Sequence, residues 1–218
     1  MKVSSLGYRT DLLFVRFDGV ILDRGDYVVA RTESNPGYHW GNFLLFDRPP
    51  REGDAARWLE LFEQEIASKQ PTRHIAFGWD TTAGERGECK AFTARGFLVE
   101  DSLVMSASAL IPPEHTNREV EVRPLHTDRE WAAATKLQIE NRDPCHSLEG
   151  YTRFKEAQMA RYRSMAASGL GRWYGAFKGE TLVADMGLFH DGEGAARYQS
   201  VETDADHRRQ GICARLLV

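Results

Sequence analysis

The chain has 218 residues, of which 42% are hydrophobic and 28% charged, and its formal net charge at pH 7 is −4. With eleven Phe and five Trp, a chain of this length can build one large domain or two small ones, which argues against disorder. The slightly acidic balance argues against a general nucleic-acid binder, which usually carries a strong basic excess, so no nucleic-acid partner is expected.

Cysteine usage and hydropathy favour a cytoplasmic protein. Cys89, Cys145 and Cys213 are odd in number and far apart, and none forms a Cys-x-x-Cys pair, so neither a disulfide framework nor a metal site is predicted. No apolar run approaches about 18 residues, and the start of the chain lacks the apolar stretch of a signal peptide. No membrane association is therefore expected.

The first 110 residues show a β-β-β-β-α-β-α-β pattern. Strands are predicted from β-branched and aromatic runs bounded by turn dipeptides, and helices from apolar residues at helical spacing, such as Trp58 and Phe62. The predicted strands cover residues 11–17, 19–23, 26–32, 40–46, 74–80 and 97–110, and the predicted helices cover 55–69 and 86–96.

A polar, proline-bearing segment then separates two predicted domains. Residues 113–118 are the expected linker between a unit of residues 1–112 and a unit of residues 119–218. The second unit has a β-α-α-β-β-β-α pattern, with Thr127 or Asp128 as a helix cap. Its predicted elements are a strand at 120–125, helices to Asn141 and over 151–168, a hairpin turning at Lys178–Gly179, a strand at 196–203 and a helix from about Gln210.

The turn "DHRRQGICARLL" (206–217) is the stretch that carries chemistry. The first N–H groups of a helix lack partners within the helix and lie at the positive end of its dipole, so they can hold phosphates. Gly211 would let a phosphate approach the backbone, and Arg208 and Arg209 would add charge-assisted donors. Taken alone, such a run more often marks an ordinary helix start with solvated arginines.

Together with the element order, this turn resembles the signature of the GNAT acyltransferases. That signature is Arg or Gln, two residues, Gly, one residue, then Gly or Ala, entered from a strand; here it is Arg208-Arg209-Gln210-Gly211-Ile212-Cys213. Cys213 departs from the pattern because it is larger than Gly or Ala. The resemblance covers residues 119–218, as a unit that ends early. For the chain as a whole it implies an α/β fold with a mixed sheet, of the acyl-CoA N-acyltransferase type, in two related units.

The resemblance also implies a reaction and a site. Acetyl-coenzyme A would donate an acetyl group to an amine that attacks directly, with a backbone N–H of the strand polarising the thioester carbonyl. Glu202 is the candidate general base, and a solvated strand carboxylate is the alternative. The general acid of the family would lie beyond Val218. The implied donor-binding residues are Val201, Thr203, Arg208, Arg209, Gln210, Gly211, Ile212, Cys213 and Ala214.

A weaker resemblance lies upstream. Residues 51–59 match the turn as Gly-x-x-Ala-Arg, with Gly53 over Gly211, and residues 89–97 are similar to a later GNAT helix. The first half therefore resembles a degenerate GNAT unit, and an unrelated α/β segment is the alternative. Asp54 follows Gly53 and places a carboxylate where pyrophosphate would lie, so this half is not expected to bind coenzyme A.

The predicted function is thus an N-acetyltransferase acting on a small-molecule amine or a peptide. The alternative is a non-catalytic coenzyme A-binding or interaction protein of the same fold, and a third reading is a truncated chain that is inactive as given. Asn141, Arg142 and Asp143 are expected to border the acceptor site. An incomplete second sheet would expose an edge, which makes a homodimer one expected arrangement.

Overall fold

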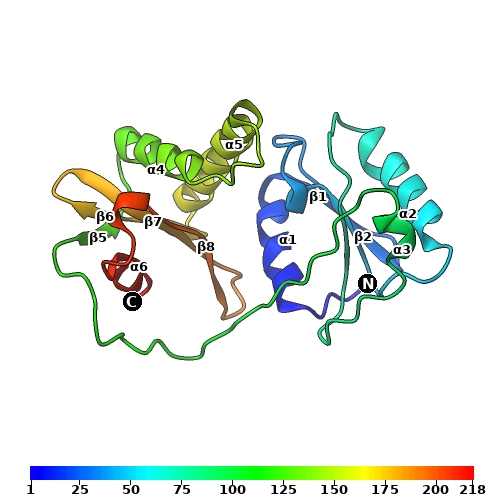
Figure 1. Cartoon of the computed structure of the whole chain (residues 1–218), viewed down its shortest axis with the longest axis horizontal. Helices are drawn as coiled ribbons and strands as arrows, with labels where there is room; N and C mark the ends of the chain where they lie inside the picture. The colour runs from blue at the N-terminus through cyan, green and yellow to red at the C-terminus, as the bar shows by residue number, and fades with distance from the viewer. The chain divides into compact units, whose positions relative to one another are not determined.

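The computed structural model describes all 218 residues, and they divide into two compact units, Met1–Ser106 and Ala107–Val218 (Figure 1). The boundary between Ser106 and Ala107 lies inside residues 1–112, the range that the sequence analysis assigned to the first unit. The predicted linker residues 113–118 consequently belong to the second unit.

The first unit is a four-stranded sheet in the order β1-β2-β3-β4 with helices on it. Strands β1, β2 and β3 are antiparallel, whereas β4 is parallel to β3. Its elements are α1 (Leu6–Asp18), β1 (Val20–Asp23), β2 (Tyr27–Arg31), the 3-10 turn η1 (His39–Gly41), β3 (Phe43–Phe46), α2 (Asp54–Phe62), the π-turn η2 (Glu63–Ala67), β4 (Phe77–Trp79) and α3 (Lys90–Thr93).

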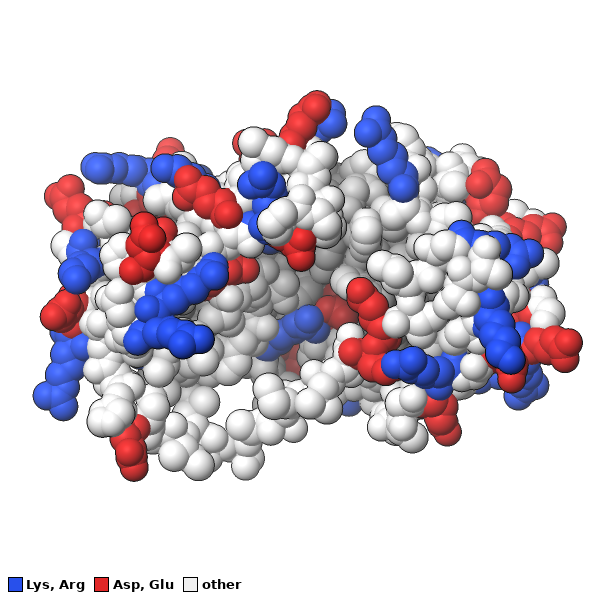
Figure 2. Space-filling view, in the orientation of Figure 1, with Lys and Arg blue, Asp and Glu red and all other residues white.

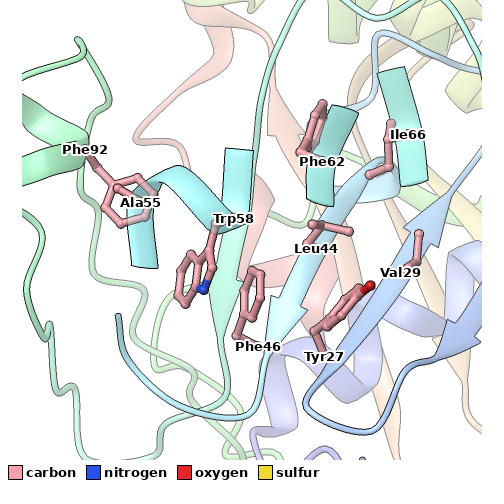
Figure 3. Close-up of a cluster of buried hydrophobic side chains, with 9 residues drawn as sticks. All are labelled: Tyr27, Val29, Leu44, Phe46, Ala55, Trp58, Phe62, Ile66 and Phe92. Atoms are coloured by element: carbon pink, nitrogen blue, oxygen red, sulfur yellow. The ribbon is translucent and has the colours of Figure 1, made fainter. Parts of the chain in front are cut away.

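The central strands of this unit are buried on both faces, which explains why they contain uninterrupted apolar runs. On β2, Val28 packs in the cluster with Leu12 and Val15 of α1, while Val29 packs in the cluster of α2. Figure 3 shows the α2 side, where the indole of Trp58 lies against the ring of Phe46 with centroids 3.6 Å apart and planes 3° from parallel.

Two strand predictions in the first unit are wrong. Residues 11–17 belong to helix α1, in which Tyr8, Leu12 and Val15 lie at helical spacing on one buried side. This spacing is visible only when the residues before position 11 are included. Residues 97–110 form no strand. No neighbouring strand takes their backbone hydrogen bonds, and Leu98, Leu103 and Met105 are each more than 85% exposed.

The second unit confirms the predicted β-α-α-β-β-β-α order. Thr127 is the helix cap and forms a capping box with Glu130, and the last helix begins two residues later than predicted. The elements are β5 (Glu121–Pro124), α4 (Asp128–Glu140), α5 (Leu148–Ala167), β6 (Gly171–Lys178), β7 (Thr181–His190), β8 (Ala196–Thr203), the 3-10 turn η3 (Ala205–His207) and α6 (Ile212–Leu217).

The sheet of this unit is antiparallel in the order β5-β6-β7-β8, so β8 is an edge strand. Helices α4 and α5 cover one face, where Tyr162 stacks on Trp173 with centroids 5.0 Å apart. On the other face, Ile212 and Leu216 of α6 pack in one cluster with Ala184 of β7. The two layers are visible in Figure 1.

The surface carries both signs of charge. On the face drawn in Figure 2, Lys and Arg side chains alternate with Asp and Glu side chains. None of the helices combines the length and the apolar character that crossing a membrane requires.

The stack of Trp58 on Phe46 predicts a large stability loss on truncation. Trp58 is only 1% exposed, so Trp58→Ala is expected to cost about 3–5 kcal/mol of unfolding free energy, measured by urea denaturation followed by circular dichroism. Trp40→Ala is the matched control, because Trp40 is 38% exposed and should cost about 1 kcal/mol. Equal losses would contradict the assignment of Trp58 to the core.

His74 predicts an acid-sensitive first unit. Burial, and next the nearby His39, lower the pKa of His74 from 6.5 to about 4. Between those values the unfolded chain binds a proton that the folded chain does not, so stability should fall as pH drops from about 6.5 towards 4, by about 2 kcal/mol. In His74→Phe that part of the pH dependence of urea unfolding should vanish; an unchanged slope would contradict it.

Candidate functional site

The edge strand β8 carries a β-bulge at the predicted site. Ser200 and Val201 lie opposite Met186 alone, because the register passes from Gly187↔Gln199 directly to Asp185↔Glu202. Ser200 has φ +46°, in the left-handed region that few non-glycine residues adopt. A bulge leaves one residue of the longer strand outside the ladder, so the backbone here is not fully used by β7.

Beyond the bulge, the backbone of β8 presents groups to its open edge. Asp204 donates its backbone N–H to the carbonyl of Val183 on β7. The carbonyl of Thr203 points the other way, where it accepts hydrogen bonds from Asn141 Nδ2 at 3.0 Å and from Arg208 Nε at 3.1 Å. Alternate residues of an antiparallel strand direct these groups to opposite edges. The carbonyl of Thr203 therefore faces away from β7, towards α4 and the basic turn.

The basic turn itself contains two residues with positive φ, Arg209 at +60° and Gly211 at +74°. Turns that mix left- and right-handed residues make concave arrays of N–H groups that suit anions. Arg209 is exposed and makes no hydrogen bond or ion pair. Arg208, by contrast, is already engaged, with Nη2 donating to Asn141 Oδ1 at 3.0 Å in addition to its bond to Thr203.

Gly211 is required by its neighbours as well as by its φ. A Cβ there would come within 3.1 Å of the backbone N of Asn117 and 3.3 Å of His115 O, so the segment at 115–117 packs against its Cα. Asn117 also donates its N–H to Gly211 O and its side-chain amide to Gln210 O. The carbonyl side of the turn is thereby covered by the chain itself.

The remaining predicted donor residues lie in α6. Ile212 is buried against the sheet, Cys213 is exposed, and Ala214 is half-buried. Cys213 thus does not point into the core. Among the His, Cys, Asp and Glu side chains of the chain, no group of three is arranged to hold a metal ion.

Glu202 lies on the face of β8 that α4 covers. Its Oε2 accepts a hydrogen bond from Asn141 Nδ2 at 2.9 Å, and its charge contributes, after burial, to raising the pKa of Tyr151 on α5. The side chain of Asn141 is therefore hydrogen-bonded to Glu202, Thr203 and Arg208 at the same time. Of the other two loop residues, Asp143 accepts from the backbone N–H of Cys145, and Arg142 follows Asn141 in the loop.

A buried polar cluster beside Glu202 was not predicted. Gln138, Lys155, Gln158 and Asp185 are each at most 5% exposed. Lys155 Nζ donates to Gln158 Oε1 at 2.8 Å and to Gln138 Oε1 at 3.3 Å. Gln138 Nε2 donates to Asp185 Oδ1 at 2.5 Å. The sequence signal was Asp185, a carboxylate in the middle of the otherwise apolar strand "TLVADMGLF".

Burial sets the ionisation of this cluster. It raises the pKa of Asp185 well above its usual value, and the charge of Glu202, its cross-strand partner, raises it further, although the hydrogen bond from Gln138 opposes the shift. Burial also lowers the pKa of Lys155 to about 8, against the attraction of Glu202 and Asp185. Asp185 and Glu202 thus differ in environment although they lie side by side.

The first unit contains a similar helix start with different chemistry. Gly53 precedes α2 with φ +87°, as Gly211 precedes α6. The carboxylate of Asp54, however, accepts from the backbone N–H of Arg51 at 2.7 Å and from Arg48 Nη1 at 2.6 Å. The bond from Arg48 is the main cause of its lowered pKa. A shallow cavity of ≈ 300 Å³ lies beside it, lined by Arg48, Pro49, Pro50, Arg51, Glu85 and Gly87.

Comparison with known proteins places the fold. No protein-family model matches the chain, and no curated protein matches it. A functionally unknown conserved protein from Staphylococcus epidermidis is similar in structure, with a TM-score of 0.65 at 10% identity, over 92% of this chain and 77% of that one. A GCN5-related N-acetyltransferase from Kribbella flavida has a TM-score of 0.60 at 14% identity, over 98% of this chain and 80% of that one.

At these identities the likeness concerns the fold alone. The chain has a mixed α/β fold similar to that of a GNAT N-acetyltransferase, as the sequence resemblance implied.

The Arg48–Asp54 pair predicts a measurable coupling in the first unit. The two side chains are only 30% and 12% exposed, so a double-mutant cycle with Arg48→Ala and Asp54→Ala should give about 1 kcal/mol of coupling in urea unfolding at pH 7. The pKa of Asp54 is lower in the folded protein than in the unfolded chain. The coupling energy should therefore be fully present at pH values above the usual pKa of an aspartate, and it should disappear as the pH falls through the pKa of Asp54 in the folded protein. Additive losses at pH 7 would contradict the pair.

Proposed function

We propose that this protein is an N-acyltransferase that transfers an acetyl group from acetyl-coenzyme A to an amine by direct attack. The observation that carries the proposal is the continuity of the bulged, open edge of β8 with the basic turn at Arg208–Gly211. The similarity of the fold to a GNAT N-acetyltransferase supports it.

The residues present fit coenzyme A. Its pantetheine would pair with the open edge at Val201 and at the N–H of Thr203, because the Thr203 carbonyl already accepts from Asn141 and Arg208. Its pyrophosphate would lie on the N–H groups of residues 210–214, where Arg209 offers an unengaged guanidinium. The bound cofactor would supply the thioester. A backbone N–H left outside the ladder at the bulge is the group suited to polarise its carbonyl.

Glu202 is the proposed general base. Asn141 holds its carboxylate at 2.9 Å, and Arg208 in turn holds Asn141, so the orientation of Glu202 is fixed from the same turn that would receive the phosphates. The carboxylate would take a proton from the attacking amine, directly or through a water molecule. The amine nitrogen bonds to the acetyl carbon as the C–S bond breaks, and coenzyme A leaves as a thiolate that takes a proton from water. Because the amine attacks the thioester directly, no covalent enzyme intermediate forms.

We also propose that the two units are related, with only the second binding the donor. Support comes from the matching left-handed glycines before α2 and α6, each entered after a strand. The Asp54 carboxylate, already bonded to Arg48 and Arg51, would repel a phosphate at the first unit's helix start. We further propose that the acceptor is a small amine or a peptide. The protein would act in the cytoplasm, and it would pair with a second copy of the chain.

Glu202→Gln tests the base. Thiol release from acetyl-coenzyme A with the best amine of a panel should fall about 100-fold or more, with little change in the KM for the donor. Glu180→Gln, at the exposed turn between β6 and β7, is the matched control and should retain full activity. If Glu202→Gln retained the wild-type rate, Glu202 would not be the general base.

Arg209→Glu tests the donor site. The reversed charge should weaken coenzyme A binding about 10-fold or more in titration calorimetry, because it lies where pyrophosphate would bind. Arg129→Glu makes the same change in net charge at an exposed position of α4 and should bind normally. Equal effects of the two variants would argue against a local site. Saturable binding with no thiol release from any amine would instead favour a non-catalytic coenzyme A-binding protein.

A further inference from the structure

We infer that Gln138 on α4 is a positioning residue that holds the β8 bulge in its active shape. Its side-chain amide is 1% exposed and reaches the strand from the neighbouring helix. Gln138 Nε2 donates to the carbonyl oxygen of Ser200 at 2.8 Å and to Asp185 Oδ1 at 2.5 Å. It therefore binds the bulged residue of β8 and the residue on β7 that lies beside the bulge.

The orientation of the Gln138 amide follows from Lys155. An ammonium group can only donate hydrogen bonds, so the amide atom that faces Lys155 Nζ at 3.3 Å must be the oxygen Oε1. The nitrogen Nε2 then faces the strands, where both of its partners are oxygens that accept. Gln158 Oε1 takes a second hydrogen bond from Lys155 at 2.8 Å, which keeps the ammonium in place.

The bulge needs such an anchor. Ser200 stands at φ +46°, a backbone conformation that costs a non-glycine residue free energy and persists only where the surroundings fix it. The carbonyl of Ser200 belongs to the peptide that contains the N–H of Val201. A hydrogen bond to that carbonyl therefore fixes the peptide plane and the direction of the Val201 N–H.

This inference rests on the proposed function, in which a backbone N–H at the bulge polarises the donor carbonyl. A donor displaced by about 1 Å can cost on the order of 100-fold in rate without weakening substrate binding elsewhere. Gln138 makes no hydrogen bond to the basic turn or to Glu202, so its loss should leave the phosphate contacts and the base in place.

Gln138→Met and Gln158→Met form a matched pair. Each removes one buried glutamine that accepts a hydrogen bond from Lys155, but only Gln138 reaches β8. Relative to Gln158→Met, Gln138→Met should lower kcat about 10- to 100-fold while the KM for acetyl-coenzyme A changes less than about 3-fold. Amide hydrogen exchange at residues 200–202 should be about 10-fold faster in Gln138→Met, and exchange in β6 should be equal.

Equal kcat and equal exchange in the two variants would overturn the inference, because the glutamines would then serve only as buried partners of Lys155. If Gln138→Met does not fold, Gln138→Leu removes the donor without leaving a buried carboxyl that could take a proton and donate in its place, with the same expectations. If the wild type releases no thiol with any amine, the proposed function fails. The exchange comparison at residues 200–202 then decides the anchoring by itself.

Discussion

Two side-chain amides one helical turn apart join helix α4 to strand β8, and the candidate site depends on them. Gln138 donates to the carbonyl of Ser200, and Asn141 donates to the carbonyl of Thr203. Because a backbone carbonyl cannot move without its peptide plane, these bonds set the course of the strand through its bulge and into the basic turn. The carboxylate of Glu202, held by Asn141, takes its direction from the same helix.

The sequence predicted the second unit well and the first unit less well, for physical reasons. In the second unit, helices of 13 and 20 residues give clear periodicity, and Thr127 with Glu130 marks a helix start. In the first unit, residues 11–17 are too few for their apolar pattern to distinguish a helix from a strand. An apolar run such as 97–110 forms a strand only where a neighbouring strand pairs with it. The basic turn and Glu202 were visible locally, whereas the cluster around Gln138 and Asp185 joins α4, α5 and β7 and has no local pattern.

The two helix starts show how little backbone conformation alone says about ligands. Gly53 and Gly211 adopt left-handed conformations in the same place relative to a helix. One is followed by Asp54, whose carboxylate is satisfied by Arg48 and Arg51, and the other by Ile212, which is buried against the sheet. The first helix start carries a carboxylate that is satisfied within the chain, whereas the second carries none. The side chain after the glycine therefore decides whether such a start can serve an external anion.

The extended segment after α3 has a consequence for handling the protein. Leu98, Leu103 and Met105 are exposed on a stretch with no regular secondary structure. Proteases need an unfolded stretch of chain in the active cleft, so an enzyme that cleaves after large apolar residues will find its preferred bonds here before it can reach the packed cores. Cleavage at this stretch would leave each core intact on its own fragment, and the folding of the two units could then be followed separately.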